Sequence, residues 1–294
     1  MNRRNVILVL AWMAGAVVSF SGTAIAVRLL SGRLGAFEIQ AVRNAGGLAL
    51  LLLAIGFRPQ LRWQLGPGSL KLQLGRNVLH YVGQYGWNHA VIALPLATVF
   101  ALEFTAPVWL AALAVPLLGE RLTAGRIGAI ILGFLGVLVV LRPGVEAFHP
   151  VALSMLATAF TFAATAVCTK ALTRRVSTFT ILLWMNLLQL PLSLALSDLS
   201  LLGELQGTEI AGALLLVLTG VTSHFCLTQA YRHGDALVVM PLDFLRIPMI
   251  AVVGWYFYGE RLDPFVFAGA ALIILGIAWN LSAEARRRHP APDG

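Results

Sequence analysis

The chain has 294 residues, of which 59% are hydrophobic and only 12% are charged. This composition, with a mean hydropathy of +0.83, excludes a water-soluble globular protein and predicts one that crosses a lipid bilayer several times. The net charge of +8 comes from lysine and arginine residues that lie mostly between apolar runs rather than on one basic face, which argues against nucleic acid as a partner.

Clusters of charged residues, glycine and proline divide the chain into ten apolar runs, each close to the roughly 20 residues that a membrane-spanning helix needs. We therefore predict an all-α integral membrane protein with ten transmembrane helices. In chain order the runs are Val6 to Leu30, Phe37 to Phe57, Arg76 to Leu94, Leu96 to Leu118, Ala124 to Leu141, Val151 to Leu172, Thr178 to Ser197, Glu209 to Tyr231, Ala236 to Tyr258 and Pro264 to Leu281.

The two halves of the chain repeat each other weakly. The segment Gly119-Glu120-Arg121-Leu122 returns 140 positions later as Gly259-Glu260-Arg261-Leu262, and Leu102-Glu103-Phe104 returns as Leu242-Asp243-Phe244. We assign a first five-helix repeat to residues 1–145, a second to 146–283 and a cytoplasmic basic tail to 284–294. Duplicated apolar halves are the usual plan of membrane transporters.

Charge asymmetry predicts the orientation. With the N-terminus inside, the outer segments hold only Arg28, Arg33, Arg142 and Arg261, whereas 15 of the 21 basic residues, Arg76 and Arg126 among them, fall in cytoplasmic segments. Both termini are therefore expected in the cytoplasm. Because five helices per half is an odd number, the second half must run through the membrane upside down relative to the first, which makes the repeat inverted.

Ten helices in a five-plus-five inverted-topology repeat, with a Gly-Glu-Arg-Leu turn after the fourth and the ninth, resemble the drug/metabolite transporter superfamily, in particular its EamA-domain branch. The resemblance covers essentially the whole chain. It implies a basket of helices around a central cavity that exports amino acids and other small metabolites from bacteria. One departure is Ile247, which stands where the first half has Pro107; Pro248 follows it, so the bend in the ninth helix is expected to be displaced.

Polar side chains form two neighbouring rows on the predicted third helix. The first row is His80, Gln84 and Asn88, and the second is Tyr81, Tyr85 and His89. Polar groups inside a bilayer usually face a bundle interior or a water-filled cavity, so we predict that these rows line a central cavity; hydrogen bonding between helices is the alternative. The repeat places His224, Thr228 and Gln229 of the eighth helix at the corresponding positions.

Charged residues inside the predicted helices are fewer. Glu103 and Asp243 are repeat mates roughly 12 Å deep, and Arg246 lies within pairing reach of Asp243 on the same helical face. Asp243 and Arg246 either neutralise each other or bind a zwitterionic solute or relay protons. Glu103 has no basic partner nearby in sequence, and Arg43 on the second helix is a candidate to form an ion pair with it across the bundle.

Aromatic residues complete the predicted site. Phe100 and Trp184 lie deep enough to stack against an aromatic or apolar solute, although core packing is equally open. The full predicted lining is His80, Tyr81, Gln84, Tyr85, Asn88, Phe100, Glu103, Trp184, His224, Thr228, Asp243 and Arg246. Glycines on the fifth and tenth helices are expected to mark packing seams, either within the bundle or in a dimer.

Three classes of function compete. The sequence has no HExxH, DDxxD or GxSxG motif for an intramembrane enzyme, no repeated filter element for a channel and no glycine-rich nucleotide loop for an ATP-driven pump. We therefore expect a secondary transporter, a monomer or weak homodimer in the bacterial inner membrane, that needs no cofactor or metal. It is expected to export amino acids, aromatic or other apolar ones among them, and related small metabolites by alternating access; the alternatives are sugar derivatives, nucleotides and cationic drugs. The sequence leaves uniport and proton coupling open.

Overall fold

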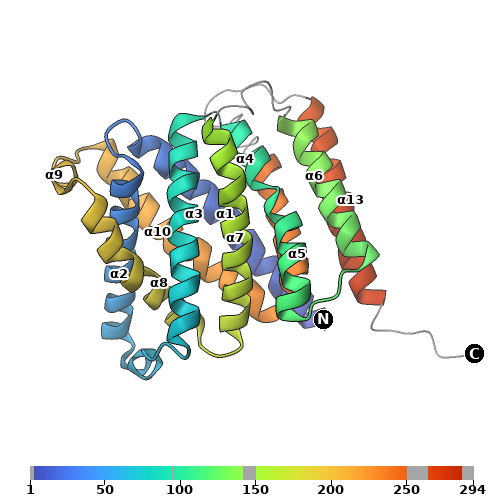
Figure 1. Ribbon diagram of the computed structural model, residues 1–294, viewed down its shortest axis with the longest axis horizontal. Coiled ribbons are helices and arrows are strands. Elements are labelled where there is room, and N and C mark those ends of the chain that lie inside the picture. Colours follow the sequence, from blue (N-terminus) through green and yellow to red (C-terminus); the bar gives the residue numbers. More distant parts are fainter. Residues whose placement is uncertain (1–2, 95, 142–149, 250–263, 287–294) are drawn as a thin grey trace, which may run out of the picture.

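The computed structural model describes residues 3–94, 96–141, 150–249 and 264–286, and every element in these ranges is helical. The helices run side by side as one bundle (Figure 1). They are α1 (Arg3–Leu30), α2 (Ala36–Phe57), η1 (Pro59–Gln64), α3 (Leu70–Ala93), α4 (Leu96–Glu103), α5 (Ala106–Leu118), α6 (Ala124–Leu141), α7 (Pro150–Thr173), α8 (Thr178–Leu196), α9 (Leu199–Leu202), α10 (Thr208–His233), α11 (Ala236–Val239), η3 (Met240–Leu245) and α13 (Pro264–Arg286).

The predicted runs correspond to these helices, but not all of the helices are clear membrane spans. Among the described residues, α1, α2, α7, α8 and α10 are long and apolar enough to cross a membrane. Shorter apolar helices lie in α5, α6 and α13, whereas α3 carries the polar rows. The all-helical membrane fold is confirmed, and the ten-span inverted arrangement stays a prediction.

Two of the predicted helices are interrupted at matching positions of the repeat. The fourth run breaks after Glu103, and α5 begins at Ala106. Pro107 lies in the first turn of α5, where proline's lack of a backbone N–H leaves no helical hydrogen bond unmade. In the second half, Asp243 lies in the 3-10 segment η3. The displaced bend predicted at Pro248 falls at the edge of the described residues, which end at position 249, and stays a prediction. Both repeated acidic residues lie where the α-helix is interrupted.

The helices pack in pairs that join the two halves of the chain. The main pairs are α1 with α10, α3 with α7, α2 with α8, and α6 with α13. The repeat mate of α1 is α7, and that of α3 is α10, so replacing each helix by its mate turns the first pair into the second. The other two pairs each join a helix to its own mate, as a two-fold repeat requires. The pair α6 and α13 lies together at one edge of the bundle (Figure 1).

Glycines make the seam between α6 and α13 close. A Cβ atom at Gly136 would lie 2.6 Å from the backbone oxygen of Gly269, and one at Gly276 would lie 3.3 Å from the Cα of Ala129. Gly128 likewise faces the ring of Trp279. Small residues allow this approach of two backbones in a membrane bundle. The predicted glycine seam therefore lies within the chain.

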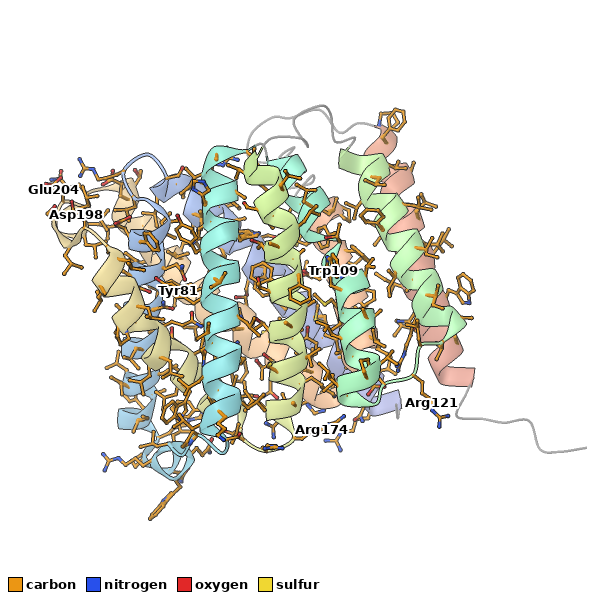
Figure 2. The ribbon with its side chains drawn as sticks, viewed as in Figure 1. Tyr81, Trp109, Arg121, Arg174, Asp198 and Glu204 are labelled. Atoms are coloured by element: carbon orange, nitrogen blue, oxygen red, sulfur yellow. The ribbon has the colours of Figure 1, made fainter. Side chains whose placement is uncertain are left out.

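The two ends of the bundle differ in charge. Arg121 and Arg174 lie at one end, and Asp198 and Glu204 lie at the other (Figure 2). This separation agrees with the prediction that Arg121 and Arg174 share one side of the membrane.

Candidate functional site

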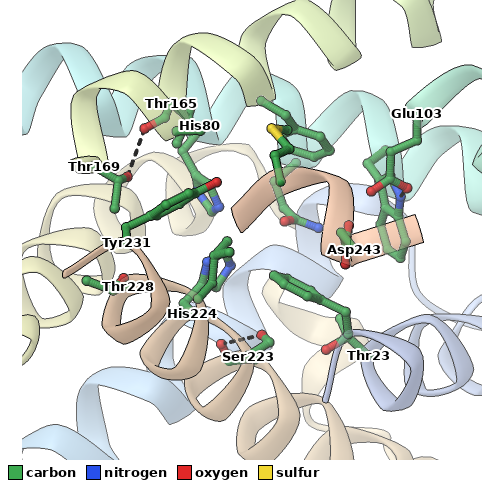
Figure 3. Close-up of a pocket in the computed structure, with 18 of the residues that line it drawn as sticks. Thr23, His80, Glu103, Thr165, Thr169, Ser223, His224, Thr228, Tyr231 and Asp243 are labelled. Carbon is green, nitrogen blue, oxygen red and sulfur yellow. Dashed lines mark hydrogen bonds between the residues drawn. The ribbon is translucent and has the colours of Figure 1, made fainter. Parts of the chain in front are cut away.

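A cavity of about 110 Å³ lies inside the bundle, and both halves of the chain contribute to its walls. The first half supplies residues of α1, α2, α3 and α4, and the second supplies residues of α7, α10 and η3. Figure 3 shows acidic side chains at one side and His80, Thr165 and Thr169 at the other. Acidic side chains and neutral polar ones from both halves therefore face one cavity.

Seven of the twelve residues predicted from the sequence line this cavity. They are His80, Gln84, Glu103, His224, Thr228, Asp243 and Arg246. The repeat matches the polar row of α10 with that of α3, and both helices line the cavity. The rings of His80 on α3 and His224 on α10 are 4.7 Å apart. The structure thus brings together the deep charges and two residues of the first polar row of α3, His80 and Gln84.

The second polar row of α3 points elsewhere. Tyr85 stacks on Phe37, with ring centroids 4.5 Å apart, and Tyr81 is buried without lining the cavity. Asn88, from the first row, also lies outside the cavity lining and donates a 3.4 Å hydrogen bond to the backbone oxygen of Ala36. Successive residues of an α-helix are rotated by about 100°, so a row adjoining the cavity-facing one turns toward neighbouring helices.

Phe100 and Trp184 also lie outside the cavity lining. The indole nitrogen of Trp184 donates a 2.9 Å hydrogen bond to the backbone oxygen of Leu65, which anchors α8 to the loop after η1. Phe100 is buried and packs 5.2 Å from the guanidinium of Arg246. The aromatic walls are instead Phe20, Trp87, Phe162 and Tyr231.

An acidic cluster of Glu103, Asp243 and Arg246 occupies one side of the cavity. One terminal nitrogen of Arg246 donates to Glu103 Oε1 at 2.5 Å and to Asp243 Oδ2 at 2.8 Å, and the indole of Trp87 donates to Glu103 Oε2 at 2.7 Å. The pairing of Asp243 with Arg246 is confirmed. The cation that pairs with Glu103 is Arg246 rather than Arg43, because Arg246, at the end of η3, packs against the end of α4.

The acidic cluster carries a formal charge of −1, from two carboxylates and one guanidinium. Asp243 Oδ1 is buried and has no hydrogen-bond partner. Three rings, those of Phe20, Phe100 and Phe104, surround the guanidinium at 5.2 to 5.5 Å, so cation–π contacts hold it in place.

A basic cluster of Arg43 and Arg76 also lines the cavity. Sequence analysis places Arg76 in a cytoplasmic segment, and this is wrong because α3 begins at Leu70 and carries Arg76 into the bundle, where it is 2% exposed. Arg126 is buried at the start of α6 and pairs with Asp235 at 2.6 Å, and its predicted side of the membrane stays a prediction.

Sequence reasoning also missed polar residues of α7 and α10 that line the cavity. They are Thr165, Thr169, Ser223 and Tyr231. The four-residue spacing of Thr165 and Thr169 in an apolar run is the same signal that revealed the row on α3. In the described residues no group of three His, Cys, Asp or Glu side chains is placed to hold a metal ion.

Comparison with known proteins identifies this architecture. The model of the EamA-like transporter family matches residues 7–142 and again 149–282. The chain belongs to the EamA-like transporter family. One solved structure, a crystal structure of a protein, shares the fold with a TM-score of 0.76 at 16% identity, covering 96% of this chain and 99% of that one.

Relatives of this EamA-family chain are named for different solutes. It is 29% identical over 286 residues to a riboflavin transporter of Rhizobium johnstonii, covering 95% of this chain and 93% of that one. It is 24% identical over 288 residues to an S-adenosylmethionine uptake transporter of Rickettsia felis, covering 95% of each. A pseudopaline exporter of Pseudomonas aeruginosa is 25% identical over 254 residues, 85% of this chain and 87% of that one. The chain is a membrane transporter of the drug/metabolite superfamily and not an enzyme.

Proposed function

We propose that this EamA-family transporter is a secondary carrier of small solutes that bear an amino-acid group, and that its acidic cluster binds the solute's ammonium. The observation that carries the proposal is the surplus negative charge of Glu103, Asp243 and Arg246 inside the cavity. A charge buried in a membrane bundle is costly unless it is compensated. An ammonium group contacting Asp243 Oδ1 supplies both the missing charge and the missing hydrogen bond.

The chemistry of the cavity separates the solutes for which the relatives are named. S-adenosylmethionine carries an ammonium, a sulfonium and a carboxylate, whereas riboflavin has no charged group. An uncharged solute leaves the acidic cluster uncompensated, so the cavity favours S-adenosylmethionine or a free amino acid over riboflavin. Phe20 and Phe162 in the walls offer apolar surface for a purine or for an aliphatic or aromatic side chain.

Alternating access is the mechanism that the proposal requires. Glu103 comes from the first half, and Asp243 and Arg246 come from the second, so a shift of one half against the other opens and closes the same site. The exchange of helix pairs between the halves supports the ten-span inverted repeat, with both termini in the cytoplasm of the bacterial inner membrane. Relatives are named for uptake and for export, and the amino-acid export predicted from the sequence is one direction of this exchange.

Counterflow into proteoliposomes tests the proposal. Vesicles containing the purified chain are loaded with unlabelled S-adenosylmethionine, methionine, phenylalanine or riboflavin and then given a trace of the same solute with a radiolabel. We expect label to accumulate with at least one of the amino-acid-bearing solutes and not in protein-free vesicles. Accumulation with riboflavin, and with none of the other three, contradicts the proposal.

A further inference from the structure

We infer that the basic cluster of Arg43 and Arg76 forms an anion subsite, which receives the carboxylate of the solute whose ammonium contacts the acidic cluster. The identity of this ligand rests on the proposed function. The subsite itself rests on the two buried arginines, which the acidic cluster does not involve.

The first argument is the missing countercharge. Arg43 and Arg76 are 4% and 2% exposed, and neither takes part in any ion pair among the described residues. Their hydrogen bonds go to neutral groups: Arg43 to the side-chain oxygens of Gln189 and Asn44, and Arg76 to those of Asn77 and Thr169. Two like charges held inside a bundle by neutral partners are costly, so a bound anion would relieve both.

The second argument is the set of donors left without acceptors. Arg43 Nε and His80 Nε2 are buried without hydrogen-bond partners, and both residues line the cavity. The side-chain nitrogen of Gln189 contacts His80 Nδ1 at 3.0 Å. The Gln189 oxygen lies 3.3 Å from the same Nδ1; in the tautomer in which Nδ1 accepts from the closer nitrogen, Nε2 carries the ring proton and is a free donor. The wall therefore presents N–H donors and no unpaired carboxylate.

The third argument is that the wall is built in advance. Gln189 accepts from Arg43 at 3.2 Å and donates at 3.0 Å to Asn77 Oδ1, which in turn accepts from Arg76 at 2.8 Å. A chain of neutral amides thus fixes both arginines relative to each other. Gly220 leaves room for the stem of Arg43, because a Cβ atom there would lie 3.0 Å from Arg43 Cγ. Preorganised guanidinium donors are the usual means of binding carboxylate or phosphate.

The placement of the two clusters decides which arginines take the carboxylate. Arg246 is already held by Glu103 and Asp243, so it offers little attraction to a further anion. Glu103 and Asp243 lie on one side of the cavity, and His80 and Thr169, which contacts Arg76, lie on the other (Figure 3). A zwitterion therefore places its ammonium at one wall and its carboxylate at the other.

Thermal unfolding of the purified full-length chain in detergent tests the subsite without knowledge of the solute. Potassium acetate and potassium phosphate are the probes, because a ligand that binds only the folded state raises the unfolding midpoint. The variants are Arg43→Gln and Arg76→Gln, and the matched control is Arg33→Gln, which removes an exposed positive charge away from the cavity. General salt effects act on all variants alike, so the informative quantity is the difference between them.

We expect acetate or phosphate to raise the midpoint of the wild type and of Arg33→Gln to a plateau, with at least half of this rise lost in Arg43→Gln and Arg76→Gln. Equal responses in all four proteins, including no response in any, overturn the inference. If neither glutamine variant folds, Arg76→Lys takes their place, because it keeps the charge but loses the forked donor geometry. A response of Arg76→Lys equal to that of the wild type then overturns the inference.

A second measurement separates the carboxylate of the solute from an inorganic anion as the occupant. S-adenosylmethionine and its decarboxylated analogue differ in the α-carboxylate, and we expect the wild type to exchange the former roughly 10-fold more efficiently. Arg76→Gln should reduce this preference. If acetate or phosphate stabilises the wild type, but the wild type exchanges the two solutes equally well, the occupant of the subsite is an inorganic anion. This result overturns the role of the subsite in binding the solute.

The two proposals fail separately. Anion stabilisation that depends on Arg76, without exchange of any amino-acid-bearing solute, contradicts the proposed function and supports the subsite. Exchange of these solutes without any anion response that depends on Arg43 or Arg76 supports the proposed function and overturns the subsite.

Discussion

Glu103, Asp243 and Arg246 show what a sequence can and cannot say about single residues. The repeat identifies Glu103 and Asp243 as equivalent, and the three-residue spacing identifies Arg246 as the partner of Asp243. The contact between Arg246 and Glu103 joins positions 143 apart, and no local spacing rule reaches that far. In the structure, both carboxylates therefore pair with the same guanidinium, whereas the sequence predicted only the pair of Asp243 and Arg246 and left Glu103 apart.

Neutralising the members of the acidic cluster should reveal this unit. Arg246→Gln leaves two buried carboxylates without a cation, and we expect it to lower the free energy of unfolding by about 3–5 kcal/mol. Glu103→Gln leaves the neutral pair of Asp243 and Arg246 and should cost much less. The triple variant Glu103→Gln, Asp243→Asn, Arg246→Gln removes all formal charge and should recover most of the stability that Arg246→Gln loses.

Chemical unfolding of the detergent-purified variants, followed by circular dichroism, measures these differences. A triple variant as unstable as Arg246→Gln would show that the charges do not act as a unit.

Helix interruptions could be predicted only in part. Pro107 marks the break between α4 and α5, and Pro241 stands in the first turn of η3, but a proline does not by itself tell a 3-10 segment from the start of an α-helix. The break follows from contacts with distant elements. Phe104 and Phe244, repeat mates next to the two acidic residues, pack with ring centroids 5.1 Å apart.

The first Gly-Glu-Arg-Leu turn has a structural role that its spacing does not reveal. Gly119 ends α5 in the left-handed conformation, with φ of 68°, and the next residue, Glu120, reaches the start of α11. Its two carboxylate oxygens accept from the backbone nitrogens of Ala236 and Leu237 at 2.8 and 3.0 Å. The turn thus ties the end of α5 to the helix that leads into η3. Its counterpart in the second half, from Gly259 to Leu262, lies outside the described residues.

Glu120→Gln should therefore destabilise the element that carries Asp243. The substitution keeps one acceptor but directs an amide N–H₂ at a backbone N–H and removes the charge, and we expect a cost of about 1–3 kcal/mol in the free energy of unfolding. Glu204→Gln, on an exposed side chain, is the control and should change this quantity by less than about 0.5 kcal/mol. Equal effects of the two substitutions would show that the cap contributes nothing measurable.

The repeat was the strongest global signal in the chain. The offset of 140 matches His224 with Gln84, and both residues line the cavity, where the rings of His80 and His224 are 4.7 Å apart. The basic cluster was missed because Arg43 and Arg76 lie on different helices, 33 positions apart in the chain, and neither belongs to a charged motif. Burial and partners, which decide their role, are properties of the packed bundle.

The charge difference between the ends of the bundle predicts its orientation. Single cysteines at Arg174 and Glu204, at opposite ends in Figure 2, can be introduced after Cys168 and Cys226 are replaced by serine. In intact cells, a membrane-impermeant maleimide should label the cysteine at position 204 and label the one at 174 only after permeabilisation. The reverse pattern would place the arginine-bearing end outside the cell.

Counterflow by Glu103→Gln tests the central claim most directly. This variant keeps the pair of Asp243 and Arg246 but removes the surplus negative charge that we assign to the solute's ammonium. Loss of one charge-assisted contact should lower exchange of the solute that the wild type accepts by about 10- to 100-fold, while Glu204→Gln exchanges it at the wild-type rate. Exchange by folded Glu103→Gln protein at the wild-type rate would contradict the assignment of the acidic cluster as the solute site.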